Sequence, residues 1–227
     1  MTPNCLLYYI TDRKAFAEDE ATRRRHLLEK IAEAARAGVD YIQLRERDLS
    51  ARELESLGRE AVRVVRVAQP GMSEQSRTSL LINSRTDVAL AVGAQGVHLR
   101  SEDISPREAR TIWERCGTSG PAREVSPQVL TIGVSCHTSA EVTKAAVDNA
   151  SFAAFAPVFE KKDAPGMPPV GLELLEQACR ERIPVIALGG VTLGNARACL
   201  KAGAAGVAAI RLFQENEIRT IVKQLRG

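Results

Sequence analysis

The stretch IPVIALGGVTLGNARACLKAGAAGVAAIRLF, residues 183–213, decides the fold. Its first apolar run, Ile183–Leu188, is continuous, which is typical of a strand buried on both faces of a parallel sheet. Two glycines then break the run, and the pattern over Leu193–Ala202 predicts a helix. A second apolar run follows at Gly206–Ile210. The stretch therefore predicts a strand, a glycine turn, a helix and a second strand, which is the repeating unit of α/β folds.

The turn in this stretch is a candidate phosphate site. Gly189 and Gly190 lack a Cβ, so an anion can approach their backbone N–H groups, and Arg211 follows the next strand. In (β/α)8 barrels, phosphate groups bind in such a cup after strands seven and eight. The alternative is that the glycines only turn the chain and Arg211 pairs with a surface carboxylate, and this stretch alone leaves both readings open.

The same alternation of strand and helix extends through the chain. Ser50 and Glu53 have the spacing of a capping box before one of the helices. Eight strands, each followed by a helix, in 227 residues predict a single TIM-barrel domain over residues 1–227. The expected strands span residues 5–10, 41–44, 80–83, 96–99, 129–135, 152–159, 183–188 and 206–210, and the expected helices 18–37, 51–67, 87–92, 105–115, 139–148, 171–182, 193–202 and 214–225.

Composition limits the class of protein. Apolar residues make up 44% and charged residues 26%, as in ordinary globular domains, and a net charge of +3 does not favour nucleic acid as a partner. The five cysteines lack CxxC spacing, which indicates reduced thiols. No apolar run approaches the thickness of a bilayer and no secretory leader is recognised, so we expect no membrane partner and a cytoplasmic location. Homo-oligomer formation is left open.

Polar residues gather where the strands of a barrel would end. Because barrel enzymes build their sites at these carboxyl ends, we expect the residues to face one ligand. They are mostly cationic, with only Glu46 and Asp103 opposing, which predicts an anionic, phosphorylated small molecule. The ring comprises Arg45, Glu46, Arg47, Asn83, Ser84, His98, Arg100, Asp103, Ser135, Cys136, His137, Lys161, Lys162, Gly189, Gly190 and Arg211.

Two residues of this ring have simpler readings. His98 stands between apolar neighbours and is expected to be a hydrogen-bonded histidine of the barrel rather than a ligand-binding one. Cys136 has no local group to orient it as a nucleophile, so we expect it to pack in the core.

The segment 160–170 is a candidate lid over the mouth. It carries three prolines and exceeds the usual length of a βα connection.

Motifs along most of the chain resemble one known family. In this order they are similar to segments of thiamine-phosphate synthase and its TenI-like relatives: YYITD at 8–12, QLRER at 43–47, INSRTDVALAVGAQGVHLRSED at 82–103, IGVSCHT at 132–138, FAPVF at 155–159 and IPVIALGGV at 183–191.

This resemblance implies an activity and a set of site residues. Members of the family join hydroxymethylpyrimidine diphosphate to a thiazole phosphate and release pyrophosphate with the help of magnesium. By resemblance, Arg45 contacts the diphosphate, Asn83 orients it and Ser135 helps to hold the pyrophosphate. The predicted site has Arg45, Asn83, Ser135 and Lys162 as catalytic residues, Arg47, Gly189, Gly190 and Arg211 as phosphate-binding residues, and Asp103 as magnesium ligand.

The chain also departs from the family pattern at the metal site. Ser84 stands where the family has an aspartate, so one magnesium carboxylate is replaced, and Arg100 stands where the family has glycine. A TenI-like thiazole tautomerase is the second reading because it needs no metal, although its histidine falls at Pro157. A third reading is a phosphate-ligand binding or regulatory barrel without catalysis.

Overall fold

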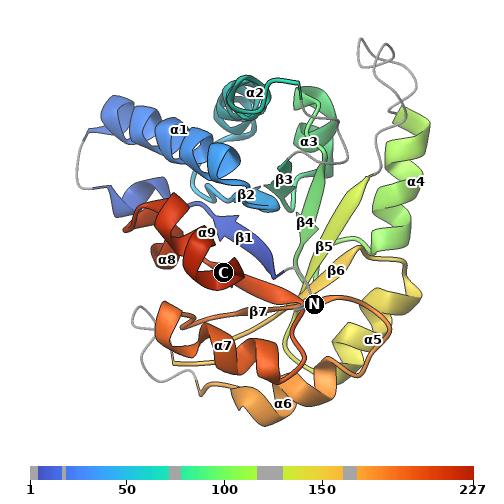
Figure 1. Ribbon diagram of the computed structural model, residues 1–227. Helices are drawn as coiled ribbons and strands as arrows, with labels where there is room; N and C mark the ends of the chain where they lie inside the picture. The colour runs from blue at the N-terminus through green and yellow to red at the C-terminus, as the bar shows by residue number, and fades with distance from the viewer. Residues whose placement is uncertain (1–4, 17–18, 72–77, 117–129, 161–167) are drawn as a thin grey trace.

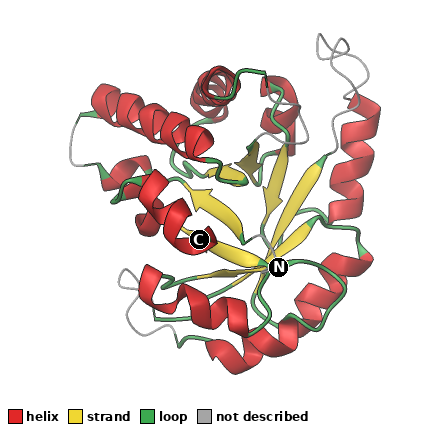
Figure 2. Ribbon diagram, in the orientation of Figure 1, coloured by secondary structure: helices red, strands yellow, loops and turns green. Residues whose placement is uncertain are grey.

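Eight parallel strands form the centre of the fold, and helices surround them (Figures 1 and 2). The structure is a computed structural model that describes residues 5–16, 19–71, 78–116, 130–160 and 168–227. The strands are short and mostly buried, as expected of apolar runs covered on both faces. They are β1 (Leu6–Ile10), β2 (Tyr41–Leu44), β3 (Ser79–Asn83), β4 (Gly96–Leu99), β5 (Thr131–Cys136), β6 (Phe152–Phe155), β7 (Val185–Leu188) and β8 (Gly206–Ala209).

The strands pair in chain order, and the ring closes between β8 and β1. Leu6 lies opposite Gly206 and Tyr9 opposite Ala209 in the closing pair. Because all eight strands are parallel, their carboxyl ends meet at one mouth of the barrel, where barrel enzymes carry their active sites. The predicted (β/α)8 barrel is confirmed.

The helices pack on the outside of the barrel. Glycine or a polar cap ends several of them as the sequence predicts; α1, for example, ends at Gly38, which has a φ of 80°. No helix of the described residues is both long enough and apolar enough to cross a membrane. The helices are the 3-10 turn η1 (Arg13–Ala15), α1 (Glu20–Ala37), α2 (Ala51–Ala68), α3 (Thr86–Val92), α4 (Pro106–Cys116), α5 (Ser139–Val147), α6 (Gly171–Ala178), α7 (Leu193–Lys201), α8 (Arg211–Gln214) and α9 (Ile218–Arg226).

Two apolar clusters form the core. The larger fills the layer between the strands and the helices. The smaller lies inside the barrel, as expected because side chains of alternate strand positions point inward. Its buried members are Tyr8, Ile10, Leu81, Phe152, Ile186 and Ala208.

The closing part of the chain differs from the prediction. A single helix over 214–225 is wrong: α8 ends at Gln214 and α9 begins at Ile218. The Ile218 N–H donates to Glu33 Oε1 at 2.6 Å, so a carboxylate from α1 caps the new helix. Arg211 is also the first residue of α8 rather than the end of a strand, because β8 ends at Ala209.

Two other elements are shorter than predicted. β6 ends at Phe155 instead of residue 159, since Pro157 has no N–H to donate to a neighbouring strand. Helix α6 ends at Ala178 instead of residue 182. There Arg180 and Glu181 donate to the carbonyls three residues before them, a tighter turn that is common at helix ends.

Candidate active site

An amide-centred network joins the ends of β2 and β3 at the barrel mouth. Gln43, 1% exposed, donates from Nε2 to Asn83 Oδ1 at 3.0 Å. Asn83 in turn donates from Nδ2 to Ser84 Oγ at 3.1 Å. Ser84 has a φ of 60°, and its backbone N–H donates to the His98 carbonyl at 2.8 Å. The side chain of Asn83 is therefore held at both ends, in the orientation that a ligand at the mouth would meet.

Asp103 lies beside this network and is ionised. Burial acts to raise its pKa, but the backbone N–H of Arg100, the hydroxyl of Ser84 and the Arg100 guanidinium outweigh burial and lower it. Arg100 donates to Asp103 Oδ2 from its backbone at 2.8 Å and to Oδ1 from Nη2 at 3.0 Å. The loops after β3 and β4 thus bring one carboxylate, one hydroxyl and one guanidinium together.

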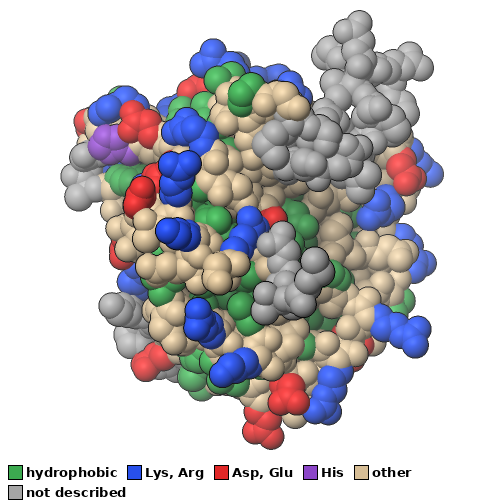
Figure 3. All heavy atoms as spheres, in the orientation of Figure 1, with side chains coloured by type: hydrophobic (Ala, Val, Ile, Leu, Met, Phe, Trp, Pro, Cys, Tyr) green, Lys and Arg blue, Asp and Glu red, His purple; other side chains and the backbone are tan. Residues whose placement is uncertain are grey.

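Arg45 carries positive charge into the mouth, whereas its neighbour Arg47 is exposed. Burial lowers the pKa of Arg45, and the charge of Arg47 lowers it further. Arg45 also lies near enough to His98 to lower the pKa of that ring. On the face drawn in Figure 3, Lys and Arg side chains are spread over several elements rather than gathered over one. Arg45 is therefore a partly buried cation close to His98, as an anion site at the mouth requires.

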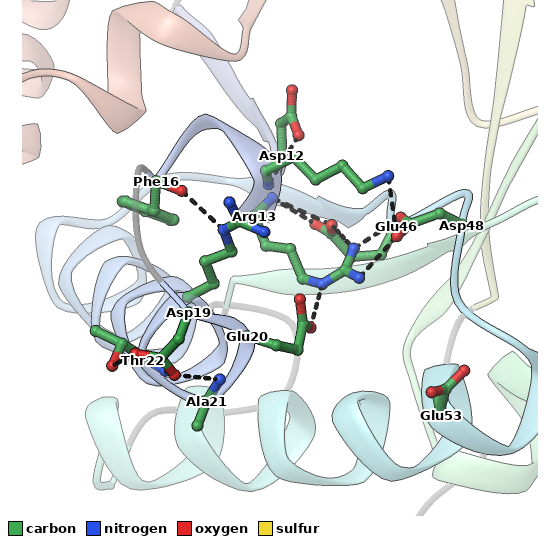
Figure 4. Close-up of polar contacts among 12 residues, drawn as sticks. Asp12, Arg13, Phe16, Asp19, Glu20, Ala21, Thr22, Glu46, Asp48 and Glu53 are labelled. Carbon is green, nitrogen blue, oxygen red and sulfur yellow. Dashed lines mark hydrogen bonds and ion pairs between the residues drawn. The ribbon is translucent and has the colours of Figure 1, made fainter.

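A buried arginine fixes the loops that carry Arg45 (Figure 4). Arg13, 4% exposed, donates to Glu20 at 2.6 Å, to Glu46 at 3.2 Å and to Asp48 at 2.7 and 2.8 Å. The prediction that Glu46 faces the ligand is wrong. Its carboxylate is buried and accepts from Arg13 and from the Thr11 hydroxyl, the latter at 2.6 Å.

The same network reaches the backbone of Arg45. Thr11 Oγ1 donates its proton to Glu46 and accepts a hydrogen bond from the Arg45 N–H at 3.0 Å. Arg13, Glu46 and Thr11 therefore connect the end of β1 to the end of β2 through side chains that are almost completely enclosed. In a low-dielectric surrounding such a fully paired network is rigid, so it holds Arg45 in place.

Three polar side chains form a chain inside the barrel. The Tyr8 hydroxyl lies 2.9 Å from His98 Nδ1, and His98 Nε2 lies 2.9 Å from Ser135 Oγ. Burial, together with the charge of Arg45, lowers the pKa of His98 to about 3. The expectation that His98 is a hydrogen-bonded barrel histidine is confirmed, and its partner Ser135 is one of the predicted site residues.

Cys136 packs and does not act as a nucleophile. Burial raises the pKa of its thiol to about 12, and the nearby charge of Glu141 adds to the shift. His137, the next residue, has its Nδ1 2.7 Å from the Ala156 carbonyl. The packing role expected for Cys136 is consistent with both observations.

The glycine turn after β7 has the conformation that its sequence suggests. Gly189 and Gly190 have φ values of 94° and 65°. A Cβ on Gly190 would lie 2.5 Å from the Glu160 carbonyl oxygen, so no larger residue fits there. Asn195 of α7 donates from Nδ2 to the Gly190 carbonyl at 3.0 Å, so the helix after the turn fixes its conformation. The turn is therefore closely packed against the segment after β6, with Gly189 buried and Gly190 partly exposed. Its role in phosphate binding stays a prediction.

Two predicted residues have less support from the geometry. Arg211 is half-buried at the start of α8, two residues beyond β8, which neighbours β7. Its role in phosphate binding stays a prediction. Lys162 and the greater part of the candidate lid, 161–167, lie outside the described residues.

Asp103 is the one predicted metal ligand. Within the described ranges, no group of three or more His, Cys, Asp or Glu residues could hold a metal ion. Mg²⁺ in enzymes is often bound by one or two carboxylates together with substrate phosphates. Asp103 and the Ser84 hydroxyl beside it fit this second arrangement, in which a diphosphate supplies the remaining oxygens.

Comparisons with known proteins show the family of the chain. The sequence profile of the family described as thiamine monophosphate synthase matches residues 7–213. The chain belongs to this family. It is 35% identical over 207 residues to a protein named thiamine-phosphate synthase from Roseiflexus castenholzii, covering 90% of this chain and 79% of that one. A protein of the same name from Moorella thermoacetica is 36% identical over 216 residues, covering 89% and 91% of the two chains.

A solved structure is similar as well. The thiamine phosphate pyrophosphorylase from Pyrococcus furiosus superimposes with a TM-score of 0.73 at 30% identity, covering 99% of this chain and 95% of that one. For a member of the thiamine monophosphate synthase family, the mouth of the barrel is therefore the candidate active site.

Sequence reasoning missed two parts of this family member's site. Arg13 was not singled out because its partners Glu46 and Asp48 lie 33 and 35 residues away. Tyr8 was noted only as part of a motif, although its hydroxyl contacts His98, 90 residues later. A buried arginine beside a first strand gives no periodic signal. The inward direction of alternate residues in a strand could have indicated Tyr8.

Proposed function

We propose that this chain joins hydroxymethylpyrimidine diphosphate to a thiazole phosphate and releases pyrophosphate, forming thiamine phosphate. The family match over 7–213 supports this reaction. The observation that carries it for this chain is the arrangement of two separate groups of phosphate-binding character around one mouth. An enzyme that couples two phosphorylated substrates needs one such group for each substrate.

These two groups lie on opposite sides of the ring. The strands follow chain order in a closed barrel of eight, so β3 and β7 face each other across the mouth. Asn83 and Ser84 end β3, and Gly189 follows β7. One side offers charged and amide groups, and the other offers backbone at a glycine turn. A diphosphate and a monophosphate can therefore bind at once, with their reacting carbon and nitrogen between them.

The diphosphate is assigned to the side of β2 to β5. Arg45 and Arg47 neutralise its charge, and the doubly held Asn83 orients it. Ser135 donates to a diphosphate oxygen, and Lys162 binds the leaving group. The bond between the pyrimidine methylene carbon and the diphosphate oxygen breaks, and its electron pair leaves with pyrophosphate. Positive charge near those oxygens stabilises the charge that develops on them.

The thiazole phosphate is assigned to the glycine turn. Gly189 and Gly190 donate backbone N–H groups to it, and Arg211 supplies charge from the start of α8. The lone pair of the thiazole nitrogen then forms the new bond to the methylene carbon. Holding both partners at fixed sites lowers the entropic part of the barrier.

Magnesium is proposed to bind at Asp103. When bound, Mg²⁺ neutralises the leaving pyrophosphate. Asp103 would hold it, with the Ser84 hydroxyl adjacent. Arg100 orients the Asp103 carboxylate through its backbone and side chain, so this chain's own residues keep the carboxylate ionised.

The tautomerase reading finds less support. At the position of the catalytic histidine of tautomerases the chain has Pro157, which has no ionisable group. His98 is enclosed and, with a pKa lowered to about 3, is neutral at physiological pH. We further propose a cytoplasmic location, because all five cysteines are free and fit a reducing compartment. Phosphorylated small molecules are the proposed partners.

The experiment is to incubate the purified protein with both substrates and magnesium. We expect thiamine phosphate and pyrophosphate in equal amounts, with Asp103→Asn strongly impaired. Conversion of the thiazole carboxylate phosphate tautomer alone would identify a tautomerase. Saturable binding of either phosphate without turnover would identify a binding protein, and both results would contradict the proposal.

A further inference from the structure

The three-residue chain of Tyr8, His98 and Ser135 runs from the closed interior of the barrel towards its mouth. Tyr8 of β1 is 0% exposed and His98 of β4 is 2% exposed, whereas Ser135 near the end of β5 is partly exposed. The His98 ring is surrounded by the rings of Tyr8 and Phe152, with centroids 5.7 and 6.2 Å away. A Cβ on Gly133 would lie 2.7 Å from His98 Nδ1, so the glycine leaves the space that the ring occupies.

The His98 ring carries one proton on its nitrogens. Enclosure disfavours the charged form, and Arg45 adds to this effect, so the ring is neutral at physiological pH. A neutral imidazole has one N–H donor and one acceptor nitrogen. Both nitrogens are in hydrogen-bond contact, one with Tyr8 and one with Ser135. Which nitrogen carries the proton therefore decides the direction of both hydrogen bonds.

The Tyr8 phenol determines which His98 nitrogen carries the proton. Among the described residues, the hydrogen-bond partner of the Tyr8 hydroxyl is His98 Nδ1. If Nδ1 carried the proton, the Tyr8 proton would be buried without an acceptor, which native structures avoid. Tyr8 therefore donates to Nδ1, and the ring proton is on Nε2. His98 Nε2–H then donates to Ser135 Oγ.

This direction determines what Ser135 offers to a ligand. Its oxygen already accepts a hydrogen bond from His98, so its own proton is available to donate. In the opposite tautomer the Ser135 proton would point back to His98, and the lone pairs of the hydroxyl would face the mouth. Lone pairs repel an anion, whereas a hydroxyl proton binds one. The buried pair Tyr8 and His98 thus determines whether the Ser135 hydroxyl offers a proton or lone pairs to a ligand.

We propose that Tyr8 and His98 are positioning residues that hold Ser135 as a hydrogen-bond donor to the diphosphate of the substrate and to the pyrophosphate product. The proposal rests on the proposed function in that it takes the diphosphate as the anion near Ser135. In this proposal Tyr8 and His98 act through Ser135 and not on the reacting atoms.

The first test measures the tautomer directly, without substrate or activity. In protein labelled with ¹⁵N, the two ring nitrogens of His98 give different chemical shifts according to which one carries the proton. We expect the Nε2–H form at every pH between 6 and 8. The Nδ1–H form would overturn the proposal even if the protein makes thiamine phosphate, so this failure is distinguishable from that of the proposed function.

The second test uses a double-mutant cycle with inorganic pyrophosphate as probe. Ser135→Ala and Tyr8→Phe should each weaken binding in calorimetry by roughly three- to tenfold, the scale of one typical hydrogen bond. Tyr8→Phe should have no further effect in the Ser135→Ala background, and should let the Nδ1–H tautomer of His98 become populated. Tyr9→Phe is the matched control, because it removes an adjacent buried phenol that donates to Gln214 at 3.1 Å, and it should bind normally.

Three results would overturn the proposal. One is a Tyr8→Phe effect that persists in full in the Ser135→Ala background, since Tyr8 would then act elsewhere. Another is unchanged pyrophosphate affinity in a folded Tyr8→Phe variant, with folding checked by thermal unfolding. The third is failure of the unaltered protein to bind pyrophosphate, which would remove the anion from this site.

Discussion

The Arg13 guanidinium donates to both carboxylate oxygens of Asp48, from Nη1 at 2.7 Å and from Nη2 at 2.8 Å. This paired contact joins the segment after β1 to the segment after β2. The same guanidinium contacts the enclosed carboxylate of Glu46, whose side chain is 1% exposed. One buried cation therefore supports two loops of the barrel mouth.

Removing this cation should destabilise the fold. Arg13→Ala leaves the charge of Glu46 enclosed and unpaired, and we expect a loss of about 3 to 5 kcal/mol in the free energy of unfolding. Urea unfolding measures it. The matched control is Lys14→Ala, which removes an exposed ion pair to the same Asp48 and should change stability by less than about 1 kcal/mol. Equal effects of the two variants would contradict the role of Arg13.

The enclosed His98 should make stability depend on pH. Its pKa is about 3 in the folded protein, against about 6.5 in an unfolded chain, so the unfolded state binds more protons between these values. Stability from this group is complete above pH 6.5 and is lost as the pH falls towards 3. The slope approaches about 1.4 kcal/mol per pH unit. Urea unfolding between pH 5 and 7.5 tests this, and a His98 NMR titration midpoint near 6.5 would contradict it.

The glycine turn should not accept a side chain. Gly190→Ala places a Cβ 2.5 Å from the Glu160 carbonyl at a φ of 65°, and we expect about 1 to 3 kcal/mol of destabilisation and weaker binding of thiazole phosphate. Gly194→Ala is the control, because its nearest contact would be the Thr192 hydroxyl at 3.8 Å. Thermal unfolding and calorimetry compare the two. A neutral Gly190→Ala would show that the turn is adaptable.

Features set by neighbouring residues could be predicted from the sequence. The capping box at Ser50 and Glu53 is confirmed, with the Ser50 N–H donating to Glu53 at 2.8 Å and the Glu53 N–H donating to Ser50 at 3.3 Å. Apolar runs located the strands because a parallel barrel buries both faces of each strand. The order of strands then placed Arg45, Asn83 and Ser135 at one mouth.

Features set by distant residues could not be predicted. The break before α9 depends on Glu33 of α1 accepting from Ile218, 185 residues later. The position of Glu46 depends on Arg13, whose side chain turns inward only because three carboxylates surround it. Such contacts leave no periodic pattern in the sequence, since each depends on the folded path of the chain.

Replacing Ser84 beside the proposed magnesium ligand Asp103 should add a second carboxylate. The Ser84 hydroxyl is among the groups that lower the pKa of Asp103, so it lies near that carboxylate and Ser84→Asp would bring two carboxylates to one place. Aspartate also tolerates the φ of 60° at this position. We expect higher magnesium affinity in calorimetry. Ser101→Asp, an exposed change in the nearby loop, is the control for added charge. Unchanged affinity in Ser84→Asp would mean that the Arg100 guanidinium excludes the ion.

Substitution of Arg211 tests its proposed role in binding the thiazole phosphate. Arg211 follows β8, which pairs with β7, so its backbone lies next to the strand that leads into the glycine turn. Arg211→Ala should weaken binding of that phosphate by about 1.5 to 3 kcal/mol, the range of a charge-assisted hydrogen bond. Arg219→Ala, an exposed arginine of α9, controls for the change in net charge. Calorimetry with thiazole phosphate measures both. Equal affinity in the two variants would show that the glycine turn binds the phosphate without Arg211, because backbone N–H groups alone would then account for the observed binding.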